Sequence, residues 1–95
     1  MSHVTLFTNA VKNTSTPIIT FDTDDAVILF DGTFDGETVT IYVLAKDGSQ
    51  LPLTGGSITA PGAKLVQLYE GARLQLVISN GAGTPSISSD LYTRR

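Results

Sequence analysis

The 95-residue sequence contains no cysteine and no tryptophan, and it has a single histidine, His3. Without cysteine no disulfide can form, a thiolate metal site is excluded, and the redox compartment is unconstrained. No apolar run approaches the roughly 18 residues that span a bilayer. The first residues also lack the basic start and apolar segment of a secretory signal, so we expect neither a membrane partner nor export. A chain of this size holds one core, and residues 1–95 are expected to form a single domain.

Basic residues are scarce as well, and the charge is unevenly distributed. Residues 1–47 carry seven acids against Lys12 and Lys46, whereas residues 48–95 carry two acids against four basic residues. The net charge is −3. Nucleic-acid binding requires a dense basic surface that displaces counterions from phosphates, and the terminal Arg94-Arg95 is too short to provide one. No nucleic-acid partner is expected.

Helix signals are equally weak, because glycine, proline and β-branched residues interrupt every long 3.6-residue period. Short apolar runs bounded by Gly, Asp, Asn or Pro recur instead, and they predict an all-β fold, a single antiparallel β-sandwich or jelly roll of about eight short strands. Local pattern does not set strand order, so jelly-roll and immunoglobulin-like topologies are alternatives. The expected strands are Val4–Asn9, Ile18–Phe21, Ala26–Phe34, Glu37–Lys46, Ser49–Leu53, Ser57–Ala60, Lys64–Tyr69, Arg73–Asn80 and Ser86–Thr93.

Two Asp-Gly pairs predict type I′ turns, which require positive φ at both central residues. The turn at Asp47-Gly48 would pair Lys46 with Ser49 and place Leu44 opposite Leu51. Pro52 cannot donate to a ladder, so its strand is expected at a sheet edge.

The other pair, Asp35-Gly36, would place Phe30 opposite Ile41 and complete a three-stranded meander over residues 26–53. The run "AVILF" at 26–30 is apolar on both faces and indicates a central strand. The glycine-rich stretches "LTGGS" and "NGAGT" are interpreted as hairpin loops.

Six of the nine carboxylates lie within residues 21–39. Asp22 opens a D-x-D pattern like that of an EF-hand loop, but the sixth position is Val27 instead of glycine and the twelfth is Thr33 instead of glutamate. A less regular calcium site at Asp22, Asp24 and Asp25 is an alternative to simple turn chemistry, which Asp favours through its own side-chain hydrogen bonds. We expect neither a metal ion nor another cofactor.

Asp31 and Asp35 are the pair that acid/base catalysis would use, as in glycoside hydrolysis. Each precedes a glycine, however, and no apolar surround that would raise either pKa is evident. His3 lies close to the N-terminus, whereas a catalytic triad needs a rigidly held histidine. The chain is therefore not expected to be an enzyme.

The stretches "FDGTFDGETVTIYVLAKDGSQLPL" and "YEGARLQLVISNGAGTPSISSDLY" together carry a family resemblance. Their layout resembles small β-sandwich virion proteins of tailed bacteriophages, over roughly residues 30–92. Where such proteins often have a tryptophan after the "DG" turn, this chain has Leu51 and Leu53. The resemblance implies a non-enzymatic capsid decoration (cement) protein on the capsid surface of the virion, bound to the major capsid protein and self-associating as a dimer or trimer.

The two ends of the chain are the expected interface segments, with the N-terminal strand adding to a neighbour's sheet edge. The candidate interface residues are Val4, Leu6, Phe7, Leu91, Tyr92, Arg94 and Arg95. A phage neck or tail accessory protein is one alternative function. A carbohydrate-binding module with Tyr42, Tyr69 or Tyr92 as its aromatic platform is the other.

Overall fold

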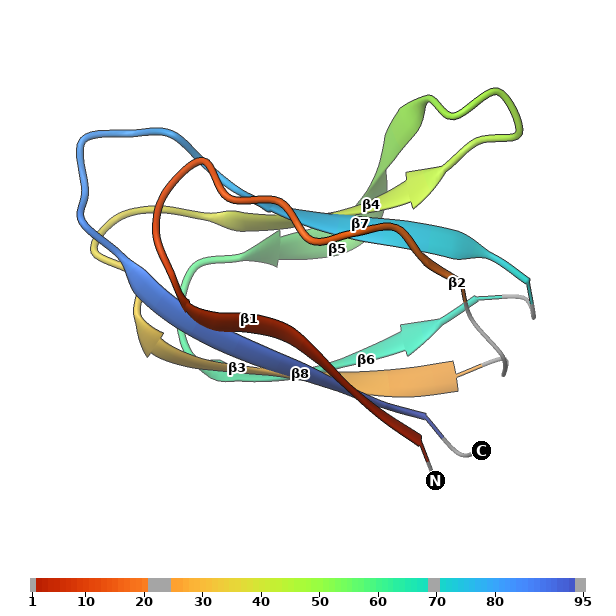
Figure 1. The fold of residues 1–95 in the computed structure, drawn as a ribbon, viewed down its shortest axis with the longest axis horizontal. Helices are drawn as coiled ribbons and strands as arrows, with labels where there is room; N and C mark the ends of the chain where they lie inside the picture. The colour runs from red at the N-terminus through yellow and green to blue at the C-terminus, as the bar shows by residue number, and fades with distance from the viewer. Residues whose placement is uncertain (1, 21–24, 69–70, 94–95) are drawn as a thin grey trace.

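The computed structural model describes residues 2–20, 25–68 and 71–93, and these form eight strands and no helix. Two four-stranded antiparallel sheets pack face to face as two layers (Figure 1). The predicted all-β sandwich is therefore confirmed. The strands are β1 (Ser2–Ala10), β2 (Ile19–Thr20), β3 (Asp25–Thr33), β4 (Val39–Leu44), β5 (Gln50–Ile58), β6 (Gly62–Gln67), β7 (Arg73–Ile78) and β8 (Ser86–Thr93).

The strand order decides between the two topologies that the sequence left open. One sheet has the order β1-β8-β3-β6 and the other has the order β2-β7-β4-β5. Each strand of the first half of the chain thus pairs with its counterpart in the second half: β1 with β8, β2 with β7, β3 with β6 and β4 with β5. This is a long hairpin rolled into two sheets, which is the jelly-roll arrangement.

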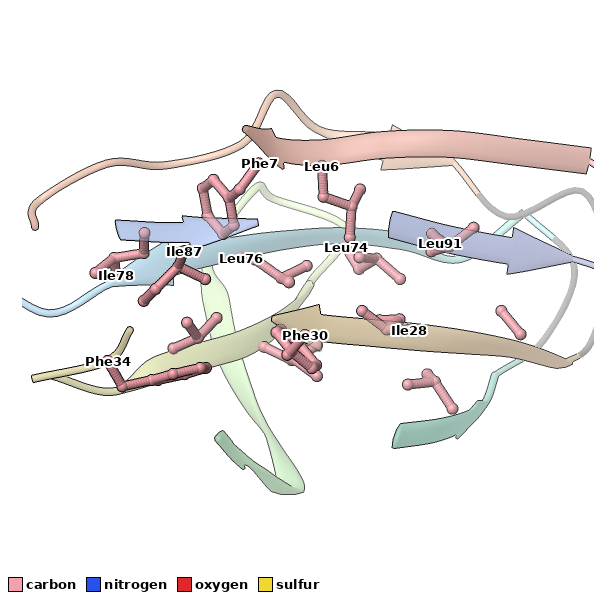
Figure 2. Close-up of a cluster of buried hydrophobic side chains, with 14 residues drawn as sticks. Leu6, Phe7, Ile28, Phe30, Phe34, Leu74, Leu76, Ile78, Ile87 and Leu91 are labelled. Carbon is pink, nitrogen blue, oxygen red and sulfur yellow. The ribbon is translucent and has the colours of Figure 1, made fainter. Parts of the chain in front are cut away.

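The core fills the space between the two inner faces (Figure 2). Alternate residues of each strand point into this core. Ile28 and Phe30 of β3, for example, face Leu74, Leu76 and other residues of the opposite sheet. Ser89 is buried as well, and its hydroxyl has no hydrogen-bond partner within the described part of the chain. The buried cluster consists of Leu6, Phe7, Ala26, Ile28, Phe30, Phe34, Val39, Ile41, Val66, Leu74, Leu76, Ile78, Ile87 and Leu91.

Strand β5 combines two segments that the sequence analysis separates. Ser49–Leu53 and Ser57–Ala60 are the two halves of one bulged strand, and the register with β4 shifts between Thr40 and Tyr42. Gly55 lies in this bulge with φ 75°, so "LTGGS" is a bulge and not a hairpin loop. The strand forms a sheet edge, as Pro52 predicts.

The hairpin at Asp47-Gly48 forms with a register one residue away from the prediction. The Ala45 N–H donates to the Ser49 carbonyl at 2.8 Å, and only Gly48 of the turn has positive φ. Leu51 therefore lies opposite Val43, not Leu44. Because a one-residue slip reverses the face of every side chain, Leu44 is buried while Leu51 is 53% exposed.

The Asp35-Gly36 turn forms as predicted, but the meander does not. Asp35 and Gly36 have φ of 50° and 83°, and the Glu37 N–H donates to the Phe34 carbonyl at 2.9 Å. Strand β3 pairs with β8 and β6, however, and β4 pairs with β7 and β5. The turn therefore crosses from one sheet to the other, and Phe30 and Ile41 are not ladder neighbours. The central position of β3 is confirmed.

Candidate functional site

The carboxylate of Glu37, directly after the Asp35-Gly36 turn, accepts three hydrogen bonds. Its side chain is only 3% exposed. Oε1 accepts from the Ser79 hydroxyl at 2.7 Å and from the Gly81 N–H at 2.7 Å, and Oε2 accepts from the Gly83 N–H at 2.8 Å. Lys12 donates to the Gly81 carbonyl at 3.0 Å and brings a positive charge to the same loop.

Asp35 binds the far end of the same glycine-rich loop. Its Oδ2 accepts from the Thr84 N–H at 2.7 Å and from the Thr84 hydroxyl at 3.0 Å. We call this set of contacts the carboxylate brace; it comprises Asp35, Glu37, Ser79, Gly81, Gly83 and Thr84. The brace fastens the β3–β4 connection to the β7–β8 connection, so "NGAGT" links the two sheets and is not a hairpin loop.

The brace requires glycine at positions 81 and 83, because other atoms of the brace lie too close to the backbone there for a side chain. A Cβ at Gly81 would lie 2.6 Å from Glu37 Oε2, and one at Gly83 would lie 2.1 Å from the Asp35 carbonyl oxygen. Backbone N–H groups that converge in this way form an anion-binding concavity, and here the anion is a side chain of the chain itself.

Both carboxylates of the brace are held in the ionised form. Hydrogen bonds from Ser79, Gly83 and Gly81 lower the pKa of Glu37 below its ordinary value of 4.5. Hydrogen bonds from Thr84 lower the pKa of Asp35. A general acid requires a raised pKa, so the lowered pKa values do not suit these two carboxylates for that role. Asp31 is engaged in its own turn, where Oδ1 accepts from the Gly32 N–H at 2.8 Å.

The lowered pKa values predict acid-sensitive stability. A carboxylate whose pKa is lower in the folded state stabilises the fold at pH values above its unfolded pKa, and this contribution disappears as the pH falls through the folded pKa. Asp47, whose pKa is lowered by hydrogen bonds from Ser49, contributes in the same direction. We expect the melting temperature to be constant between about pH 7 and 5.5 and to fall progressively below about pH 4.5. Calorimetric scans from pH 7 to 3 test this, and a melting temperature that rises on acidification would contradict it.

The acidic trio considered for calcium is only partly described. Asp22 and Asp24 lie outside the described residues, whereas Asp25 begins β3. Within residues 2–20, 25–68 and 71–93 there is no group of three or more acidic or histidine side chains that could hold a metal ion. The same residues include no helix long and apolar enough to cross a membrane.

Three of the residues predicted for the interface lie in the core. Leu6, Phe7 and Leu91 are 8%, 4% and 1% exposed, so their side chains are covered by the chain itself. Leu6 and Phe7 can both point inward, although adjacent in sequence, because the register with β8 shifts between Thr5 and Phe7. Val4 is 40% exposed. Arg94 and Arg95 lie outside the described residues.

The two ends of the chain pair with each other. Strand β1 lies at a sheet edge and its inner neighbour is β8 (Figure 1). The backbone of β1 can still add to a neighbouring sheet through its open side. On the outer face, His3 stacks on Tyr92 with ring centroids 4.6 Å apart, and its Nε2 lies 2.9 Å from Asp90 Oδ1.

The outer face of the sheet β1-β8-β3-β6 carries a feature that the sequence analysis missed. Val27 and Leu29 of the central strand β3 are 37% and 40% exposed, and Leu65 of β6 is 57% exposed. Together with Ala63 and Tyr92 they occupy neighbouring outward positions in the ladders, and we call these five residues the apolar strip. The signal was the run "AVILF", whose two apolar faces were interpreted only as a sign of a central strand.

Two of the three tyrosines considered as an alternative sugar-binding platform lie on different sheets. Tyr92 belongs to the sheet β1-β8-β3-β6 and already stacks on His3, whereas Tyr42 belongs to β4 of the other sheet. Tyr69 lies outside the described residues. An open hollow of about 280 Å³ beside the β5–β6 connection is lined by Phe30 and residues 57–64, with Lys64 as its single charged lining residue.

Comparison with known proteins leaves the family of the chain open. No protein-family model matches the sequence. No curated protein matches it either. A solved structure described as "Crystal structure of PirA" aligns with 97% of this chain and 92% of its own chain, at 22% identity and a TM-score of 0.33. A likeness at that level carries no inference about this chain.

Proposed function

We propose that the chain is a non-enzymatic structural protein of a tailed-phage virion, specifically a capsid decoration (cement) protein that binds the assembled head and stabilises it. The sequence resemblance over roughly residues 30–92 is the basis of this proposal. The partner is the major capsid protein, and the chain is located on the outer surface of the capsid.

The structural observation that supports the proposal is the carboxylate brace. The segments "GTFDGET" and "SNGAGT" are parts of the two stretches that hold the resemblance. They are far apart in the sequence, yet Glu37 and Asp35 of the first bind the backbone of the second. Asp35 and Glu37 thus serve to fix loop geometry. A fold that uses its carboxylates in this way suits a protein whose role is to present a rigid surface.

The jelly-roll architecture agrees with the proposal, since viral capsid proteins and lectins both use it. Fold alone does not assign a function, because one architecture hosts many activities. The small size adds a physical reason for binding a lattice. A chain of 95 residues has a modest core, and its folded state gains stability by mass action when it binds a partner.

The test is the copy number of the chain in purified particles of the phage that encodes it, measured by quantitative mass spectrometry against the major capsid protein. A decoration protein is expected at a fixed stoichiometric multiple of the shell subunit. Tens of copies or fewer would identify a neck or tail component instead. Absence from the particles would end the proposal.

A further inference from the structure

The two outer faces of the sandwich differ in a way that points to one of them as a contact surface. On the sheet β1-β8-β3-β6, the register places Tyr92, Val27 and Leu65 in one row across three adjacent strands, and it places Leu29 beside Ala63 in the next row. Antiparallel sheets with one solvated face normally carry polar residues at outward positions. The apolar strip departs from this pattern at the centre of the sheet.

The other outer face is polar and is engaged by the chain's own loops. Gln75 of β7 donates to the Thr16 carbonyl at 2.7 Å and accepts from Gln50 at 2.8 Å. Arg73 of the same strand donates to the Ala45 carbonyl at 2.8 Å. This face therefore directs hydrogen-bonding groups at neighbouring segments. Among its described strand residues the large exposed apolar side chain is Leu51, which lies on the edge strand β5 and not at the centre of the sheet.

The carboxylates around the apolar strip carry negative charge, and one of them, Asp90, lies 2.9 Å from His3 Nε2. Asp31 and Asp90 share the outer face with the strip, and Asp25 begins β3 on the same side. The outward positions of these four strands include no lysine or arginine among the described residues. Lys64 of β6 alternates with the outward residues, and its Nζ lies near Gly55 of the opposite sheet.

We propose that the outer face of β1-β8-β3-β6 is the docking face, and that it binds a protein surface with an apolar centre and lysine or arginine at its rim. This inference rests on the proposed function, and it specifies the surface that the shell protein offers. Complementary charge favours such a partner, whereas a second copy of this chain would bring acids against acids. The apolar strip would supply the buried centre of the contact and the aspartates its rim.

The experiment uses particles that lack the chain, titrated with purified wild type and with three lysine variants. Leu65→Lys and Val27→Lys put a positive charge into the apolar strip, and we expect each to weaken binding by at least about tenfold. Thr54→Lys is the matched control, because Thr54 is an exposed residue of β5 in the other sheet. It should bind like the wild type. Melting curves of all three variants would establish that each is folded.

A fourth variant tests the charge argument alone. Asp31→Asn keeps a side-chain oxygen for the Gly32 N–H and removes the negative charge. Its binding should be weaker than that of the wild type by a few fold at low ionic strength, with the difference shrinking as salt screens the rim.

Several results would overturn the inference. Binding of Leu65→Lys and Val27→Lys at the wild-type level would remove the face from the contact, and a loss confined to Thr54→Lys would assign docking to the other sheet. A wild-type dimer in sedimentation that Leu65→Lys dissociates would make a second copy the occupant. Failure of the wild type itself to bind particles would reject the proposed function, and this inference with it.

Discussion

A Glu37→Gln variant is expected to melt about 10 °C below the wild type, although the substitution changes one atom of the side chain. The carboxylate accepts three hydrogen bonds through its two oxygens, from Ser79, Gly81 and Gly83. An amide has one oxygen, so its NH₂ group must face at least one of these donors. A buried N–H group then loses its acceptor and meets a second donor, which is more costly than the loss of a solvent-exposed hydrogen bond.

Asp35→Asn is the matched control for this prediction. A single oxygen of Asp35 accepts both bonds from Thr84, and an asparagine can present its carbonyl oxygen in the same place. Asparagine also tolerates the positive φ of 50° at this position. We expect a much smaller drop than for Glu37→Gln, and a weaker dependence of stability on acid pH in Glu37→Gln than in the wild type. Equal melting temperatures for wild type and Glu37→Gln would show that the brace does not stabilise the fold.

The second large effect is expected for Gly32→Ala in β3, which should destabilise the fold by more than about 4 kcal/mol and leave much of the protein unfolded at 37 °C. Gly32 has φ 101°, which side-chain-bearing residues rarely adopt. An added Cβ would lie 2.1 Å from the backbone carbonyl oxygen of Ser86. Because the obstacle is backbone, β3 and β8 would have to separate where the ladder pairs Gly32 with Ile87.

Gly36→Ala is the control that separates the steric clash of an added Cβ from the energetic cost of a positive φ. Gly36 also has positive φ, 83°, but a Cβ there would have no heavy atom within 4 Å. Its expected effect is the conformational term alone, about 1–2 kcal/mol. Urea unfolding of both variants gives the comparison. Equal destabilisation of Gly32→Ala and Gly36→Ala would contradict the steric account.

Element positions were predictable from the sequence because turn chemistry and strand periodicity are local. The Asp35-Gly36 turn has the predicted dihedral angles, and Pro52 lies on an edge strand as its missing N–H requires. The pairing of β4 with β5 was predictable from the Asp47-Gly48 turn, but the partners of β3 were not predictable from the same signals. A tight turn brings two chain segments together whether they continue in one sheet or in two, so the same Asp-Gly pair is compatible with a meander and with a crossing between layers.

Side-chain roles at the brace and at the interface depended on contacts that local pattern does not encode. Glu37 was interpreted as the start of a strand, and its partners lie more than 40 residues away in the sequence. Leu6 and Phe7 were expected at the interface, but the irregular register of β1 with β8 turns both inward. Val27 and Leu29 belong to the run that predicted a central strand. Strand β3 is central, but the structure leaves these two side chains on an open face.

The most direct measurement of the central claim is a saturation titration of the purified chain onto particles that lack it, with bound and free chain separated by sedimentation. Capsid decoration predicts a plateau at a fixed number of copies per major capsid subunit, reached with intact heads and unchanged when tails are removed. No saturable binding, or a plateau of a few tens of copies that disappears with the tail, would contradict it.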